Sequence, residues 1–221
     1  MKSEIMATAI DKMRKKREVL TWRILLCATF FTLHSSLFIS CSEQVDEETD
    51  EYANWQARND AYIADIATKY SRLKSYTKDQ NVEGAVSDYV YYEVLEEGNG
   101  NESPYYSDTV RVSYRGHLIS SISYPEGYVF DQTYVGDFSW QTTGIVTSLM
   151  ATWVDGFTTA LQHMHRGDRW RIYIPYQLGY NKTEKTGIPI YSTLIFDLAL
   201  IDFTHPGYSM PRWSSREARD E

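Results

Sequence analysis

Apolar and polar residues alternate along several segments of the second half of the chain, and a period of two is typical of β-strands. These segments are residues 88–100, 108–119, 169–176 and 193–203. The clearest case places Val110, Val112 and Tyr114 on one face, with charged or polar residues between them. The last segment is apolar on both faces at several positions, as expected for a central strand that is covered by a helix.

Two other segments have the spacing of helices. Phe157, Ala160, Leu161 and Met164 recur at i, i+3, i+4 and i+7, which predicts a short helix facing the core. Near the start, apolar residues at near-helical spacing predict one amphipathic helix over about 50–76. The predicted fold class is therefore α+β, an antiparallel β-sheet wrapped on one short α-helix, with an extra N-terminal helix.

The first 40 residues have the pattern of an export signal. A basic run at 12–17 precedes a mostly apolar run at 24–39, which is shorter than the roughly 20 residues of a membrane span. Ser40-Cys41 then resembles the cleavage site of bacterial lipoproteins. We expect a lipidated Cys41 that anchors the protein to a membrane of the bacterial cell envelope. An uncleaved signal anchor is the alternative.

Charge and cysteine content narrow the function further. The net charge is −8, but residues 1–40 hold seven Lys/Arg and three Asp/Glu, so residues 41–221 carry 15 and 27, a net charge of −12. Nucleic-acid binding needs basic residues that neutralise phosphates, and an acidic domain is therefore not expected to bind nucleic acids. Because Cys27 lies in the signal and Cys41 is the expected lipid acceptor, no thiol remains for a disulfide, a nucleophile or a metal site.

The segment from His163 to Asp168 allows several interpretations. His163 and His165 could bind a metal, but they flank Met164 of the helix stripe, and no third ligand occurs at a recognisable spacing. We favour two histidines on the last turn of the helix, where the helix dipole favours positive charge. Arg166-Gly167-Asp168 could be an adhesion tripeptide, and we favour the turn that ends the helix. No metal or cofactor is expected.

The order of motifs resembles the FKBP-type peptidyl-prolyl cis–trans isomerase domain. The matching stretches are "VRVSYRGHL", "VFDQTY", "DGFTTALQHMHRGDRWRIYIPYQLGY" and "GIPIYSTLIFDLALIDF". The family pattern runs V-x-Y-x-G, Phe-Asp, a Gly-Trp helix, a Pro-to-Tyr loop and a final strand after Ile-Pro. The resulting segments are a signal peptide (1–40), an acidic tether (41–51), the N-terminal amphipathic helix (52–80), an FKBP-like isomerase domain (85–204) and a flexible tail (205–221).

The resemblance implies a site for an X–Pro segment. Its catalytic residues would be Tyr114, Phe130, Asp131, Phe157, Tyr180 and Phe196, and its substrate-binding residues Phe138, Val154 and Ile188. In the family mode, Phe157 is the floor under the proline ring. The Val154 N–H and the Tyr180 hydroxyl bond substrate carbonyls, and Asp131 orients Tyr114. The implied activity is acceleration of X–Pro rotation in exported proteins by desolvation in an aromatic pocket. We expect proline-containing polypeptides as partners and a monomeric protein.

Departures from the family leave alternatives open. Phe157 stands where the family has Trp, so a catalytically weak FKBP-like chaperone or peptide-binding lipoprotein is the second hypothesis. A surface lipoprotein that contacts glycans or proteins through some of its 18 tyrosines is the third. The segments 119–128 and 142–152 are longer than in the family. The assignments of Phe138 and Val154 depend on the path of the second segment.

Overall fold

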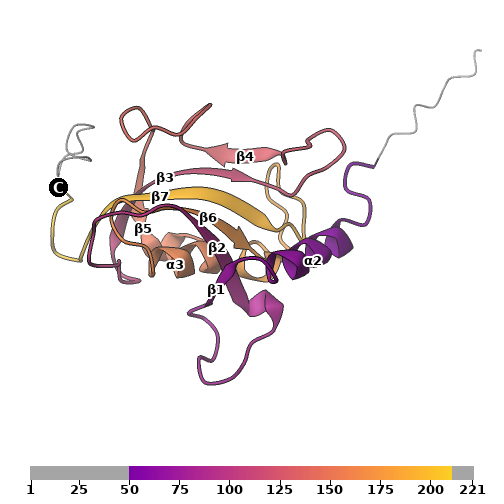
Figure 1. Cartoon of the computed structure of the whole chain (residues 1–221), viewed down its shortest axis with the longest axis horizontal. Helices are drawn as coiled ribbons and strands as arrows, with labels where there is room; N and C mark the ends of the chain where they lie inside the picture. The colour runs from indigo at the N-terminus through magenta and orange to yellow at the C-terminus, as the bar shows by residue number, and fades with distance from the viewer. Residues whose placement is uncertain (1–49, 211–221) are drawn as a thin grey trace, which may run out of the picture. The chain divides into compact units, whose positions relative to one another are not determined.

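The computed structural model describes residues 50–210, which form one antiparallel sheet with two α-helices (Figure 1). The elements are α2 (Trp55–Ile66), β1 (Ser71–Lys74), the 3-10 turn η1 (Val86–Asp88), β2 (Tyr89–Glu96), β3 (Thr109–His117), β4 (Val129–Gln132), β5 (Val146–Leu149), η2 (Met150–Thr152), α3 (Asp155–Leu161), β6 (Arg169–Ile174), η3 (Tyr176–Leu178) and β7 (Leu194–Thr204). The strand order is β1-β2-β6-β7-β3-β4, and β5 also pairs with β3. The predicted fold class is confirmed.

The core lies between the sheet and α3. Phe157, Ala160 and Leu161 of α3 have no solvent exposure and belong to the same hydrophobic cluster as the inward residues of β3, β6 and β7. The helix approaches β6 closely, because a Cβ on Gly156 would lie 2.3 Å from Cγ2 of Ile174. The longest strand, β7, is bordered by β6 and β3. This position explains why its sequence is apolar on both faces.

The helix α3 is shorter than predicted. It ends at Leu161, so the two histidines follow the helix instead of forming its last turn. His163 still bonds back to the helix, since its Nδ1 lies 2.9 Å from the carbonyl oxygen of Thr159. Gly167, at a φ of 88°, belongs to the turn that leads into β6.

The N-terminal helix is also shorter than predicted. The helix α2 ends at Ile66, and residues 71–74 form the edge strand β1, whose Leu73 pairs with Val90 of β2. Tyr70 stacks on Tyr173 of β6 with ring centroids 5.0 Å apart. The apolar residues at 70 and 73 that predicted a longer helix therefore pack on the sheet instead. Pairing of residues 71–74 with the free edge of β2 overrides their local helix propensity. The helix is also not separate from the domain, because its buried apolar side chains, Trp55, Ile63 and Ile66, belong to the main core.

The long segment 142–152 forms β5 and η2. Val146 pairs with Val112 and Leu149 pairs with Thr109, so the segment extends the sheet along the first half of β3. The predicted signal peptide and most of the predicted tether lie outside the described residues, as do residues 211–221 of the predicted tail. In the described part of the chain, no helix combines the length and apolar character that crossing a membrane requires.

Candidate active site

Five aromatic rings meet between the sheet and the N-terminal end of α3. We call Tyr114, Phe130, Trp153, Phe157 and Phe196 the aromatic cluster. The Phe196 centroid lies 5.9 Å from Tyr114, 5.5 Å from Phe130 and 5.0 Å from Phe157, each in an edge-to-face arrangement. Edge-to-face pairs at these separations are the favoured geometry of aromatic rings. Four of the five rings were predicted from the sequence, and the structure brings those four together.

A carboxylate–phenol hydrogen bond lies beside the cluster. The Tyr114 hydroxyl donates to Oδ2 of Asp131 at 2.7 Å, and Asp131 is exposed whereas Tyr114 is buried. Burial, followed by the hydrogen bond to Asp131, raises the pKa of the Tyr114 phenol above its usual value. Burial and the charge of Asp131 also raise the pKa of Tyr180. The Tyr180 hydroxyl therefore shares the electrostatic environment of the Tyr114–Asp131 pair.

Trp153 is the site residue that the motifs missed. Its ring stacks on Phe157, with centroids 4.6 Å apart and an interplanar angle of 18°, and meets the edge of Tyr114 at 5.5 Å. Phe157 has no solvent exposure, whereas Trp153 is half-buried. The predicted floor is therefore covered, and the accessible ring of the stack is Trp153. The four-residue spacing between Trp153 and Phe157 is no signal for this stack, because Trp153 precedes the helix α3 and has an extended backbone.

Val154 and Ile188 are the other two predicted substrate contacts, and both lie at the hydrophobic core of the domain. Val154 is the N-cap of α3, and its carbonyl oxygen accepts the Thr158 N–H at 3.0 Å. Within residues 50–210 the N–H of Val154 has no hydrogen-bond partner. Ile188 belongs to the same hydrophobic cluster as Phe157 and is 6% exposed. Both positions are compatible with contacts to a bound chain.

Phe138 lies in a different group of side chains. Its ring meets Tyr134 at 5.3 Å and Trp140 at 5.0 Å, and the guanidinium of Arg169 lies 4.7 Å from its centroid. Glu96 ties this group together by accepting hydrogen bonds from Trp140 and Arg169, both at 2.8 Å. Phe138 is therefore not part of the aromatic cluster, and its role in substrate binding stays a prediction. Phe138 lies in the long loop between β4 and β5, and this loop contributes its ring to the group formed with Tyr134 and Trp140.

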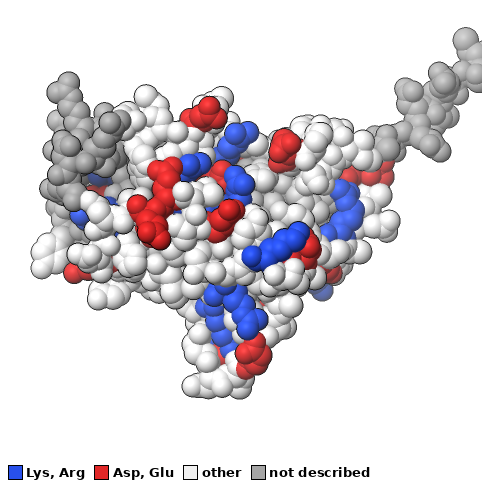
Figure 2. Space-filling model, viewed as in Figure 1, with Lys and Arg blue, Asp and Glu red and all other residues white. Residues whose placement is uncertain are grey.

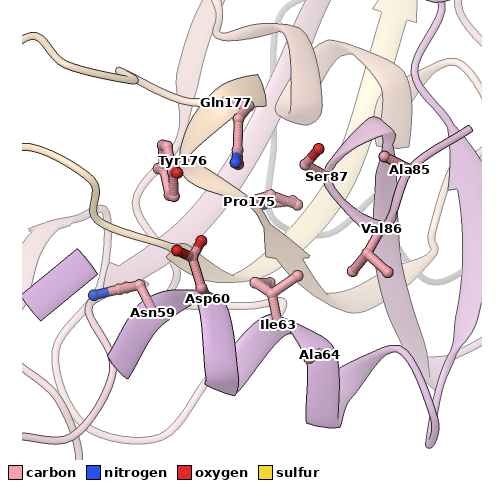
Figure 3. A pocket seen from close by; sticks show the side chains of 10 residues that line it. All are labelled: Asn59, Asp60, Ile63, Ala64, Ala85, Val86, Ser87, Pro175, Tyr176 and Gln177. Atoms are coloured by element: carbon pink, nitrogen blue, oxygen red, sulfur yellow. The ribbon is translucent and has the colours of Figure 1, made fainter. Parts of the chain in front are cut away.

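A hollow of about 280 Å³ lies elsewhere, between α2, η1 and η3 (Figure 3). None of its lining residues belongs to the aromatic cluster. Asp60 contributes a carboxylate, but no ring stack or phenol–carboxylate bond faces it. The aromatic cluster combines both features and is therefore the candidate active site.

The surface charge is mixed on the face of the molecule that Figure 2 shows. Figure 2 shows Lys and Arg interspersed with Asp and Glu over the face in view, without a continuous basic stripe there. Among the described residues, no group of three or more His, Cys, Asp or Glu side chains could hold a metal ion. His205 lies 2.9 Å from Oδ2 of the buried Asp108, and His165 is paired with Asp168.

Comparison with known proteins identifies relatives. Residues 100–201 match the family model described as FKBP-type peptidyl-prolyl cis-trans isomerase. The macrophage infectivity potentiator of Trypanosoma cruzi is 31% identical over 179 residues, which cover 80% of this chain and 83% of that protein. The isomerase FkpA of Escherichia coli is 33% identical over 150 residues, covering 66% of this chain but only 50% of FkpA. The chain thus spans about half of FkpA.

Solved structures agree with the sequence comparisons. The crystal structure of FkpA from Escherichia coli is matched with a TM-score of 0.51 at 29% identity, covering 83% of this chain and 71% of that one. A peptidyl-prolyl isomerase from Pseudomonas syringae has the same TM-score at 22% identity and supports the fold alone. On the family model, the T. cruzi relative and the FkpA match, the chain belongs to the family of FKBP-type peptidyl-prolyl cis-trans isomerases.

Proposed function

We propose that this protein accelerates the cis–trans rotation of X–Pro bonds in exported polypeptides, with the proline bound at the aromatic cluster. The observation on which the proposal depends is that Tyr114, Trp153 and Phe196 converge beside the Tyr114–Asp131 hydrogen bond in a member of an isomerase family. The substrates are flexible, proline-containing chains, and the reaction needs no cofactor.

Desolvation gives a physical route to this activity. Amide resonance sets a rotation barrier of ~18–20 kcal/mol, and the planar amide gains more from water than the twisted one does. Burying an amide without its water costs about 2–7 kcal/mol. Each 1.36 kcal/mol removed from the barrier is about tenfold in rate, so an apolar site supplies several powers of ten without a nucleophile.

The side chains have separate roles in this scheme. The proline ring rests against Trp153, the half-buried member of the stack, with the fully buried Phe157 supporting Trp153 from below. The N–H of Val154 donates to one substrate carbonyl, and the Tyr180 hydroxyl donates to another. Asp131 holds the Tyr114 phenol in place and acts as a positioning residue instead of a base.

The pH profile tests whether acid–base chemistry takes part. Because the pKa values of Tyr114 and Tyr180 are both raised, the two phenols stay protonated at neutral and mildly alkaline pH. We expect kcat/KM for an X–Pro peptide to be constant within about twofold between about pH 6 and pH 9. NMR exchange spectroscopy measures the rate directly. A bell-shaped profile in this range would indicate a general acid or base instead.

Activity measurements on the full chain and two variants test the proposal itself. The wild type should accelerate the rotation of an X–Pro peptide, and both Asp131→Ala and Tyr180→Phe should lower kcat/KM. Each substitution removes one hydrogen bond, which predicts a decrease of about 2–10-fold. A wild-type rate equal to the uncatalysed rate would exclude the isomerase proposal.

A second candidate function is binding of proline-containing chains without turnover. The full burial of Phe157 beneath Trp153 favours it, because the ring at the family's floor position cannot touch a ligand while Trp153 stays in place. Peptide binding that is unaffected by Asp131→Ala, combined with the absence of catalysis, is the result expected for this function.

The location of the protein in the cell envelope is a further part of the proposal. Ser40-Cys41 supports a lipid anchor, and one relative, from Legionella longbeachae, is named outer membrane protein MIP. We expect Cys41→Ser to move the protein from the membrane fraction to the soluble fraction and to abolish labelling by an alkyne fatty acid. Retention of the variant in the membrane without label would favour the uncleaved signal anchor.

A further inference from the structure

The N-terminal helix α2 is hydrogen-bonded to a loop of the candidate active site. Oδ1 of Asn59 accepts the Thr193 N–H at 2.7 Å, and Nδ2 of Asn59 donates to the carbonyl oxygen of Trp55 at 2.8 Å. The indole of Trp55 donates to the Ser192 hydroxyl at 2.9 Å. Asn59 and Thr193 have no solvent exposure. Both ends of the Asn59 amide are thus used, and the bonds are shielded from water.

The loop that α2 holds contains two of the predicted site residues, Tyr180 and Ile188. We define the rim loop as residues 180–193, which begin at Tyr180, include Ile188 and end directly before β7. Phe196 of the aromatic cluster follows the anchored Thr193 by three residues. A shift of the loop end therefore changes the place of Tyr180 and Ile188, whereas Phe196 is held by the pairing of β7 with β3 and β6.

The rim loop contains a backbone conformation that needs support. Tyr191 has a φ of 61°, in the left-handed region that bulky residues rarely adopt. Its N–H donates to the carbonyl oxygen of Asn181 at 2.9 Å, which closes the loop. The two residues after Tyr191 are those that Trp55 and Asn59 hold. Strained residues persist where the surroundings fix them, and here the fixing contacts come from α2.

A second contact of α2 reaches the neighbouring loop. Nη2 of Arg58 donates to the carbonyl oxygen of Ser120 at 2.8 Å, in the long segment 119–128. Tyr128, at the end of that segment, lies against the rim loop, because a Cβ on Gly187 would be only 2.9 Å from its ring. The helix therefore holds both loops on this side of the site.

We infer that α2 is a positioning element for the prolyl site and that Asn59 is its main positioning residue. The inference rests on the proposed function for its effect on catalysis, whereas the anchoring of the rim loop can be measured without it. Loss of the Asn59–Thr193 bond releases the loop end, so Tyr180 and Ile188 no longer hold the substrate in one place. The expected consequence is weaker substrate binding with a smaller change in kcat.

The same helix offers a matched control. Asp60 follows Asn59 but is exposed and lines the hollow between α2, η1 and η3 (Figure 3). Asp60→Ala therefore alters α2 without touching the rim loop. Trp55→Phe keeps an aromatic ring in the core but removes the bond to Ser192, so it tests the second anchor separately.

The experiment compares full-length wild type, Asn59→Ala, Trp55→Phe and Asp60→Ala by amide hydrogen exchange and by NMR exchange spectroscopy on an X–Pro peptide. For Asn59→Ala we expect exchange in residues 186–193 to accelerate by about tenfold or more, while the amides of β2 and β6 change far less. KM should rise by about 3–10-fold with kcat within about threefold. Trp55→Phe should show a smaller effect of the same kind, and Asp60→Ala should match the wild type.

The outcomes separate this inference from the proposed function. Uniform acceleration of exchange, or none in residues 186–193, overturns the inference whether or not the wild type is active. Local acceleration with an unchanged KM and kcat in Asn59→Ala also overturns it. An inactive wild type contradicts the proposed function, and the exchange data then decide the anchoring of the rim loop alone.

Discussion

Replacing Trp153 with alanine is expected to lower kcat/KM for an X–Pro peptide by about tenfold to hundredfold. Trp153 stacks on Phe157 at 4.6 Å and meets Tyr114 at 5.5 Å, and it is half-buried whereas Phe157 has no solvent exposure. Removing a buried aromatic surface loses about 1.5–3 kcal/mol of apolar contact. Because each 1.36 kcal/mol is about tenfold in rate, the loss of contact with the proline ring accounts for the expected decrease.

Two further variants make this prediction specific. Trp140→Ala also removes a partly buried indole, but that indole bonds Glu96 and contacts Phe138 outside the aromatic cluster. It should lower stability while kcat/KM stays within about threefold of the wild type. The double variant Trp153→Ala with Phe157→Trp moves an indole to the position that the family motif gives it. Recovery of activity in the double variant would show that an indole is needed in the stack but not at position 153 itself. A decrease of kcat/KM in Trp140→Ala as large as that in Trp153→Ala would contradict the prediction.

The regular part of the fold could be predicted because alternation and helical spacing are local properties of the sequence. The alternation of Val110, Val112 and Tyr114 was sufficient to locate β3, and the double-sided apolar run was sufficient to place β7 in the centre. The end of α2 could not be predicted in this way. Leu73 fits a helical stripe and an edge strand equally well, and only the free edge of β2 decides between them.

Those site residues could be predicted from the sequence that occupy a defined position within a family motif. Tyr114, Asp131 and Phe196 follow from their motifs and meet as expected. The contacts of Phe138 with Tyr134 and Trp140 could not be predicted, because the number of residues between β4 and β5 does not show which ring returns to the core. Trp153 was missed because stacking on Phe157 depends on the turn before α3, and a pattern centred on position 157 contains no information about that turn.

A methyl group at Gly116 is expected to disrupt the aromatic cluster more than any other small change in β3. A Cβ at this position would lie 2.6 Å from Cε1 of Phe196 and 2.7 Å from Cε2 and Cζ of Phe130. These two rings pack edge to face at 5.5 Å, so a shift of one ring to make room for the methyl group disturbs its packing on the other. The geometry explains why the V-x-Y-x-G motif ends in glycine, because a larger residue would contact both rings. The motif alone does not show this cause.

Gly116→Ala should therefore destabilise the fold by about 1–3 kcal/mol, as overpacking of a core does, and lower kcat/KM by tenfold or more. Thermal unfolding gives the first quantity, and NMR exchange on an X–Pro peptide, at a temperature where the variant is folded, gives the second. Gly136→Ala is the control, because a Cβ there meets nothing within 4 Å while its φ of 79° costs about 1 kcal/mol of backbone strain. If Gly116→Ala keeps the activity of Gly136→Ala, Phe130 and Phe196 do not shape the substrate site, and the proline must bind elsewhere.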